Sequence, residues 1–94
     1  MVRIEALEID DRILDKIESR HGVMFHEVEE ACYSSDRHVR RGREGLYKLF
    51  GHNEAGRYPL VVLAGSGGGV WRVVTARDMT PEERRMYLRA RGEG

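Results

Sequence analysis

Two periods of apolar and polar residues divide the 94-residue chain into segments. From Val2 to Ala6, apolar residues alternate with charged ones, which predicts a short strand within residues 2–9. In residues 10–22 the apolar residues recur every three or four positions, as in an amphipathic helix. The same spacing returns in residues 23–34. The first third of the chain is therefore expected to form one strand and two helices.

The ends of the first predicted helix carry residues that favour a start and a stop. Asp10 or Asp11 can accept a hydrogen bond from a free backbone N–H and places negative charge at the positive end of the helix dipole. Gly22 can adopt the left-handed conformation that ends many helices. His21 lies four residues after Ile17, on the apolar stripe. At such a position a histidine is more often a core residue than a catalytic base.

After residue 36 the period shortens to two, which is the spacing of strands. The connecting segments are short and contain glycine, as is typical of antiparallel hairpins. Pro59 has no N–H to give to a strand ladder, so a strand should begin near it. The glycine-rich residues 65–69 lack the lysine and the following helix of a phosphate-binding loop, and we interpret them as a hairpin tip. The predicted strands are residues 37–41, 46–52, 57–64 and 70–76.

A last helix is predicted within residues 79–94. Thr80, Pro81 and Glu83 have the spacing of a capping box with proline in the first turn. The expected order is a short N-terminal strand, two helices, a three- to four-stranded antiparallel meander and a C-terminal helix. This order defines an α+β fold. The length suits a single domain that spans residues 1–94.

The composition narrows the class of protein. Hydrophobic residues make up 40% and charged residues 34% of the chain, as in globular domains. No apolar run reaches the roughly 20 residues of a membrane helix, and the charged N-terminus is unlike a signal peptide, so we expect a cytoplasmic protein. The single cysteine, Cys32, excludes an internal disulfide. The four histidines lack metal-ligand spacing, so neither a metal nor another cofactor is expected.

The net charge of zero is distributed unevenly. Residues 1–30 carry nine acidic and four basic residues, whereas the other 64 carry seven acidic and twelve basic residues. All the basic residues except Lys16 and Lys48 are arginines, whose planar guanidinium can bind phosphate or carboxylate through two hydrogen bonds. Such a chain can contact a polyanion with one part and a basic partner with the other.

Arg72 and Arg77 are unusual because they lie in the last predicted strand, where a buried, unpaired charge would be costly. They are five positions apart, so a regular strand would direct them to opposite faces. A bulge or an early strand end near Ala76 is needed to bring both to one face. Each could bind an anionic ligand, or each could pair with an acidic residue of the helices.

A second basic cluster flanks the first predicted hairpin. It could be a ridge that contacts phosphates, or an edge strand that charge protects from aggregation. The cluster consists of Arg37, Arg40, Arg41 and Arg43. Three tyrosines could stack on a base or place a hydroxyl, although residues at such positions more often serve packing. They are Tyr47, Tyr58 and Tyr87.

Five segments in order resemble the BrnT-type toxins of bacterial type II toxin–antitoxin systems. The twelve-residue step from Ile9 to His21 matches the spacing of that family, and the likeness runs over nearly the whole chain. The segments are ID at residues 9–10, RHGVMFHEVEEA at 20–31, EAGRYPLVV at 54–62, RVVTAR at 72–77 and PEERRMY at 81–87.

The resemblance implies a RelE-like ribonuclease fold and a metal-independent endoribonuclease that cleaves RNA through attack by the 2′-hydroxyl. It implies that Arg72 and Arg77 hold and neutralise the scissile phosphate. Cleavage also needs a base and an acid. For these roles His21 is the first candidate, and Tyr87 or Glu83 are weaker ones. The candidate RNA contacts are Arg40, Arg41, Arg43 and Arg57.

The resemblance also implies a partner, a small antitoxin that is usually a ribbon-helix-helix DNA-binding protein. We expect it to cover the arginine-bearing cleft in a toxin–antitoxin hetero-oligomer. The chain departs from the family at Ile9, Ile13 and Ile17, where tryptophan, lysine and asparagine are usual. The alternative is a non-catalytic relative that acts as a protein- or nucleic-acid-binding module.

Overall fold

The structure, a computed structural model, describes residues 3–92; Val2 of the predicted first strand and the last two residues of the predicted final helix lie outside this range. A short 3₁₀ turn, η1 (Arg43–Gly45), joins the second and third strands. The other elements, in chain order, are β1 (Ala6–Glu8), α1 (Asp11–His21), α2 (Phe25–Tyr33), β2 (His38–Arg41), β3 (Leu46–Phe50), β4 (Pro59–Gly67), β5 (Val70–Asp78) and α3 (Pro81–Ala90).

The strands form one sheet in the order β1-β5-β4-β3-β2. β2 to β5 make the predicted antiparallel meander, and β4 begins at Pro59 as expected. β1 is shorter than predicted and pairs in parallel with β5 through Ala6 and Val70. The α+β prediction is confirmed, and the parallel edge strand makes the sheet mixed.

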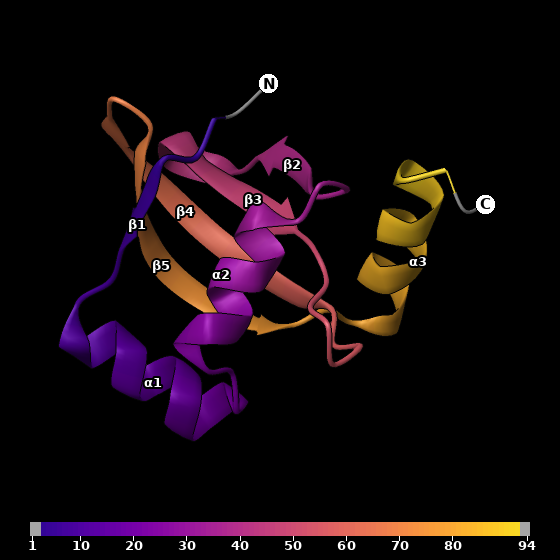
Figure 1. The fold of residues 1–94 in the computed structure, drawn as a ribbon, viewed down its shortest axis with the longest axis horizontal. Helices are drawn as coiled ribbons and strands as arrows, with labels where there is room; N and C mark the ends of the chain where they lie inside the picture. The colour runs from indigo at the N-terminus through magenta and orange to yellow at the C-terminus, as the bar shows by residue number, and fades with distance from the viewer. Residues whose placement is uncertain (1–2, 93–94) are drawn as a thin grey trace.

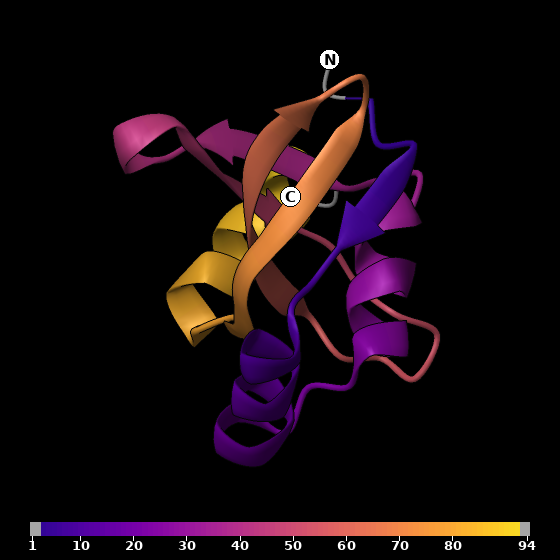
Figure 2. The same cartoon turned by 90° about the vertical axis from the view of Figure 1, so that its left-hand side faces the viewer.

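The helices lie on both faces of the sheet. α1 contacts β5, and α2 contacts β3 and β4, so both cover the same face (Figure 1). Figure 2 shows α3 on the opposite side of the sheet from α2. Only two residues, Met79 and Thr80, separate α3 from the end of β5. One sheet face is therefore closed by two helices, and the other is covered only in part.

Two hydrophobic cores match these two layers. The larger core lies under α1 and α2 and includes Ile17, Val28 and Val73, each at most 1% exposed. The smaller core fixes α3 through Tyr87, which packs with Phe50 and Leu60. The larger core thus holds α1 and α2 against the sheet, and the smaller core holds α3 against its other face.

The predicted caps are present. Asp10 Oδ1 accepts a hydrogen bond of 2.9 Å from the Ile13 backbone N, and Gly22 ends α1 with a left-handed φ of 63°. In α3, Thr80 Oγ1 accepts from the Glu83 backbone N at 3.1 Å, and Glu83 Oε1 accepts from the Thr80 backbone N at 2.9 Å. These bonds satisfy backbone donors that a helix start leaves free.

One glycine lets β3 pass close to α2. A Cβ on Gly51 would lie 2.6 Å from the carbonyl oxygen of Ala31, which is closer than real side chains come to a backbone oxygen. Any larger residue would push the end of β3 away from α2. The positions of His52 and Asn53, which follow directly, depend on this contact.

Candidate functional site

A β-bulge in β5 determines where its arginines point. Leu63 of β4 pairs with Val73, but the preceding residue, Val62, pairs with Thr75. One step on β4 thus corresponds to two on β5, so Val74 is the extra residue. Because the bulge lies between Arg72 and Arg77, it cancels the odd spacing that would separate their side chains.

The strand pairing places both arginines on one face. Arg72 pairs with Ala64 and Arg77 pairs with Leu60, and these two partners are an even number of residues apart. Directly paired residues share a sheet face, so Arg72 and Arg77 do as well. Their partners are four positions apart on β4, which corresponds to about 13 Å along the strand.

Two more basic side chains share this face. Lys48 of β3 pairs with Val62, and Arg40 of β2 pairs with Lys48. We call the face that carries Arg40, Lys48, Arg72 and Arg77 the arginine face. It lies opposite the face that α1 and α2 cover, since Val73 on that other face belongs to the larger core. The arginine face crosses four neighbouring strands and suits an extended polyanion.

The two arginines of β5 differ in their surroundings. Within residues 3–92, the exposed Arg72 makes no side-chain hydrogen bond or ion pair. Arg77 forms a two-pronged ion pair with Glu83 of α3, with N–O distances of 2.8 and 3.0 Å. Hydrogen bonding to Arg77 is the main cause that lowers the pKa of Glu83 from its usual 4.5 to about 2. An anion at Arg77 must therefore displace a carboxylate.

A cleft of about 360 Å³ opens between α3 and the β2–β3 hairpin. Its walls are basic on the hairpin side, with Arg40, Arg41 and Lys48, and acidic on the helix side, with Glu82 and Glu83. The cleft is thus lined both by cationic residues of the sheet and by Glu83, the carboxylate that forms the ion pair with Arg77.

Arg41 borders this cleft, but its side chain lies off the arginine face, as does Arg43. Arg41 pairs across the strands with Tyr47, and its guanidinium carbon lies 5.9 Å from the centre of the Tyr47 ring. Tyr47 in turn pairs with Leu63, a buried residue of the larger core, so this pair lies on the face opposite the arginine face. Arg43 is exposed in η1. The hairpin therefore presents its arginines in three directions.

The structure does not bring His21 together with the arginine pair. His21 is the last residue of α1 and is half-buried, and α1 packs on the sheet face opposite Arg72 and Arg77. Tyr87, in contrast, lies in the helix that covers the arginine face, but its side chain is fully buried. Burial is the main cause that raises the pKa of the Tyr87 phenol.

A polar cluster beside Tyr87 contains a histidine that the sequence did not single out. His52 Nδ1 lies 3.1 Å from the Tyr87 hydroxyl and 3.2 Å from Asp36 Oδ1. Arg91 Nη1 lies 3.0 Å from Asp36 Oδ2 and 3.2 Å from His52 Nδ1. These residues come from three distant segments, so no local motif could have revealed the cluster.

Arg57 lies in a network that joins three elements. Its guanidinium contacts both Glu27 oxygens at 3.0 and 3.2 Å, both Asp78 oxygens at 3.2 and 2.9 Å, and the Gly22 carbonyl at 2.7 Å. Glu27 is only 7% exposed and also accepts a hydrogen bond of 2.9 Å from Asn53. Arg57 thus links α1, α2 and the end of β5, and its predicted RNA contact stays a prediction.

Among residues 3–92, no group of three or more histidine, cysteine, aspartate or glutamate side chains is arranged to hold a metal ion. No helix in that part of the chain is both long and apolar enough to cross a membrane.

Comparison with known proteins identifies the fold. No family model and no curated protein sequence matches the chain. Among solved structures, the chain is similar to the ribonuclease toxin BrnT of Brucella abortus, with a TM-score of 0.67 and 14% sequence identity. The match covers 80% of this chain and 96% of the BrnT chain. The protein therefore has a BrnT-like α+β fold.

We expect Arg57→Ala to lower the free energy of unfolding by about 3 kcal/mol, because it leaves Glu27 buried without its cation. Urea denaturation followed by circular dichroism measures this loss. The double variant Arg57→Ala/Glu27→Gln should regain part of it. Arg43→Ala removes an exposed arginine and should cost less than about 0.5 kcal/mol. Equal losses for Arg57→Ala and Arg43→Ala would contradict the structural role of Arg57.

The ion pair between Arg77 and Glu83 should make stability depend on pH. The pKa of Glu83 is lower in the folded protein than in the unfolded chain, so the pair stabilises the fold above about pH 4.5. This contribution should disappear as the pH falls towards 2. After allowance for solvent screening, the free energy of unfolding of the wild type should exceed that of Glu83→Gln by about 1–2 kcal/mol at pH 6. Urea denaturation at several pH values tests this, and a difference that does not change with pH would refute it.

Proposed function

We propose that this protein is a metal-independent endoribonuclease toxin of a type II toxin–antitoxin system. The observation that carries the proposal is the bulge at Val74, which directs Arg72 and Arg77 to one face of a BrnT-like fold. Two further cations, Arg40 and Lys48, extend this face across the sheet. Their arrangement suits the phosphates of a single RNA strand.

In this mechanism the RNA 2′-hydroxyl attacks the adjacent phosphorus, and negative charge develops on the phosphate oxygens. Arg72 and Arg77 stabilise that charge, for which fixed cations are most effective where water is excluded. Arg77 becomes available when the phosphate displaces Glu83, which then lies beside the reacting group. Arg40 contacts a flanking phosphate on the arginine face. Arg41, Arg43 and Arg57 are candidate contacts for phosphates further along the strand.

Proton transfer needs a base for the 2′-hydroxyl and an acid for the departing 5′-oxygen. From the sequence, His21 is the first candidate, and Tyr87 and Glu83 are weaker ones. His52 joins them because it contacts the Tyr87 hydroxyl and is itself half-buried. The variants His21→Gln and His52→Gln separate the two histidines, since only the catalytic one should change the pH profile of cleavage.

The purified protein should cleave single-stranded RNA in the presence of EDTA. We expect Arg72→Ala and Arg77→Ala each to reduce the cleavage rate by about 10²–10³-fold, because each removes a cation from the charged transition state. Arg85→Ala removes an exposed arginine of α3 and serves as the matched control. Gel analysis of a labelled RNA measures the rates. If wild type cuts no faster than the two β5 variants, the enzymatic proposal fails.

A non-catalytic nucleic-acid-binding module is the second candidate function. It is favoured by Glu83, which occupies Arg77, and by Ile13, which stands where the family that the chain resembles usually has lysine. Such a module would bind RNA with a steep salt dependence and release it intact. The cleavage assay therefore separates the two candidates.

The proposed partner is a small antitoxin, most simply a ribbon-helix-helix protein encoded beside this one. It would act by covering the arginine face with acidic or apolar groups. Arg72→Glu should then weaken the complex at least tenfold in a titration, because it places like charges opposite each other. A structure of the complex that leaves Arg72 and Arg77 open would contradict this mode of neutralisation.

A further inference from the structure

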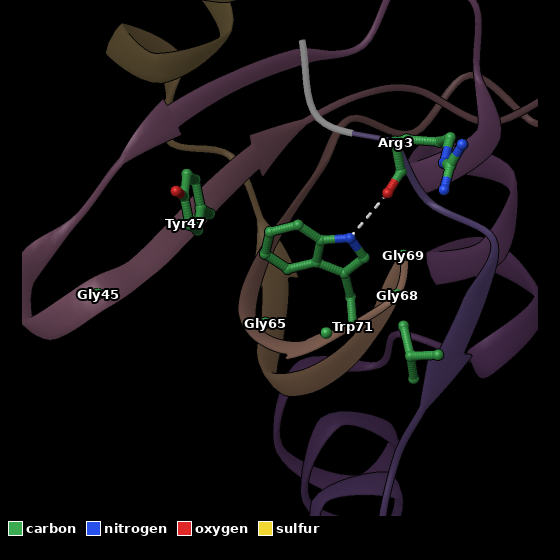
Figure 3. A pocket seen from close by; sticks show the side chains of 9 residues that line it. Arg3, Gly45, Tyr47, Gly65, Gly68, Gly69 and Trp71 are labelled. Carbon is green, nitrogen blue, oxygen red and sulfur yellow. Dashed lines mark hydrogen bonds between the residues drawn. The ribbon is translucent and has the colours of Figure 1, made fainter.

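A second hollow lies around Trp71, on the sheet face opposite the arginine face (Figure 3). It measures about 590 Å³. Trp71 of β5 and Tyr47 of β3 supply its aromatic groups, and Arg3 lies at its rim. The other wall is the tip of the β4–β5 hairpin, where Gly67, Gly68 and Gly69 follow one another. The hollow shares no lining residue with the proposed catalytic pair.

The indole of Trp71 is held in place from three sides. Its Nε1–H donates a hydrogen bond of 2.9 Å to the Arg3 carbonyl, which Figure 3 shows as a dashed line. The Tyr47 ring meets it edge to face, with 5.1 Å between ring centroids and 86° between planes. Its ladder partner is Gly65, where an added Cβ would lie 3.4 Å from the indole ring. A half-buried aromatic ring is thus fixed over a backbone with no side chain.

The glycine wall lets a flat ligand approach the ring closely. Gly67, Gly68 and Gly69 have φ values of 90°, 62° and 81°, a conformation that other residues rarely adopt. Side chains are therefore disfavoured along this wall for a conformational reason. The result is an open slot next to a rigid aromatic surface, as in sites that stack single-stranded bases.

The charges around the hollow favour a nucleotide over an apolar side chain. Arg3 is at the rim, and Arg41 lies over Tyr47. Arg72 follows Trp71 directly and belongs to the arginine face on the other side of β5. Glu5 is the acidic neighbour, and it pairs with Arg3 at 3.8 Å. An aromatic platform among cations matches the combination that binds RNA without duplex structure.

We propose that this hollow binds an unpaired nucleobase of single-stranded RNA, stacked on Trp71. The inference rests on the proposed function for the identity of the polymer. The side-chain-poor hairpin tip lets the strand pass from Trp71 around the end of the sheet to Arg72. The stacked base would then set the position of the RNA on the arginine face and create a preference for unpaired over duplex substrate.

Trp71 is the only tryptophan of the chain, so its fluorescence reports on this site alone. The probe is a short 2′-O-methyl RNA, which has no free 2′-hydroxyl and so is not cleaved. We expect saturable quenching of Trp71 at the concentrations at which the anisotropy of a labelled oligonucleotide rises. An abasic strand with the same phosphates should bind about tenfold more weakly and leave the fluorescence unchanged.

Variants test the same point without the tryptophan signal. Trp71→Leu should weaken binding of the labelled strand about tenfold, whereas Trp71→Phe keeps an aromatic ring and should lose less than threefold. Tyr33→Leu removes a side chain of α2 that is 47% exposed and should not change affinity. Thermal unfolding by circular dichroism confirms that each variant is folded.

The inference is overturned if the strand binds without changing Trp71 fluorescence, or if the abasic strand quenches equally. It is also overturned if only an apolar peptide, and no oligonucleotide, changes the fluorescence. These outcomes are separate from cleavage. If the 2′-O-methyl strand quenches Trp71 but the protein does not cleave RNA in EDTA, the endoribonuclease proposal fails and the stacking site stands. If the protein cleaves RNA but the strand does not quench Trp71, the stacking site fails and the endoribonuclease proposal stands.

Discussion

The ion pair between the buried Glu27 and Arg57 is the interaction on which the arrangement of elements depends. A carboxylate that is 7% exposed is tolerated only with a cation and hydrogen bonds to satisfy it. Arg57 supplies the cation from the β3–β4 loop, and its remaining N–H groups hold Asp78 and the Gly22 carbonyl. The same network therefore fixes the end of α1, the start of α2 and the end of β5, from which α3 begins.

The bulge in β5 gives this scaffold one sheet face that carries both arginines. Without the extra residue Val74, a sheet with the same core would direct Arg72 and Arg77 to opposite sides, and one of them would enter the apolar layer under α1 and α2. With the bulge, Val73 and Ala76 stay in the core while both arginines leave it. Core packing and the arginine face therefore depend on the same local irregularity.

α3 contacts both the arginine face and the cluster around His52. The helix is held by the small core around Tyr87 and by polar contacts of His52 and Arg91, and its Glu83 occupies Arg77. Arg72 makes no side-chain ion pair among residues 3–92, and it lies on the other side of β5 from the Trp71 hollow. A polyanion that meets the protein near Arg72 would encounter a free cation first and a carboxylate-bound one afterwards. Binding of a polyanion at Arg77 would in this way be coupled to the position of α3 through the ion pair between Arg77 and Glu83.

The sequence by itself determined most of the local structure. The helix caps at Asp10 and Thr80, the strand start at Pro59 and the four-stranded meander all follow from residues close together in the chain, whose conformational preferences act without tertiary contacts. Only the tertiary structure decided the side on which β1 pairs, the position of the bulge, the cluster around His52 and the burial of Glu27 beside Arg57. Each of these depends on contacts between segments distant in sequence. Parity along the strand showed that a bulge or an early strand end near Ala76 was needed for Arg72 and Arg77 to share a face. The tertiary structure has the bulge, at Val74, with Val73 and Ala76 packed in the larger core.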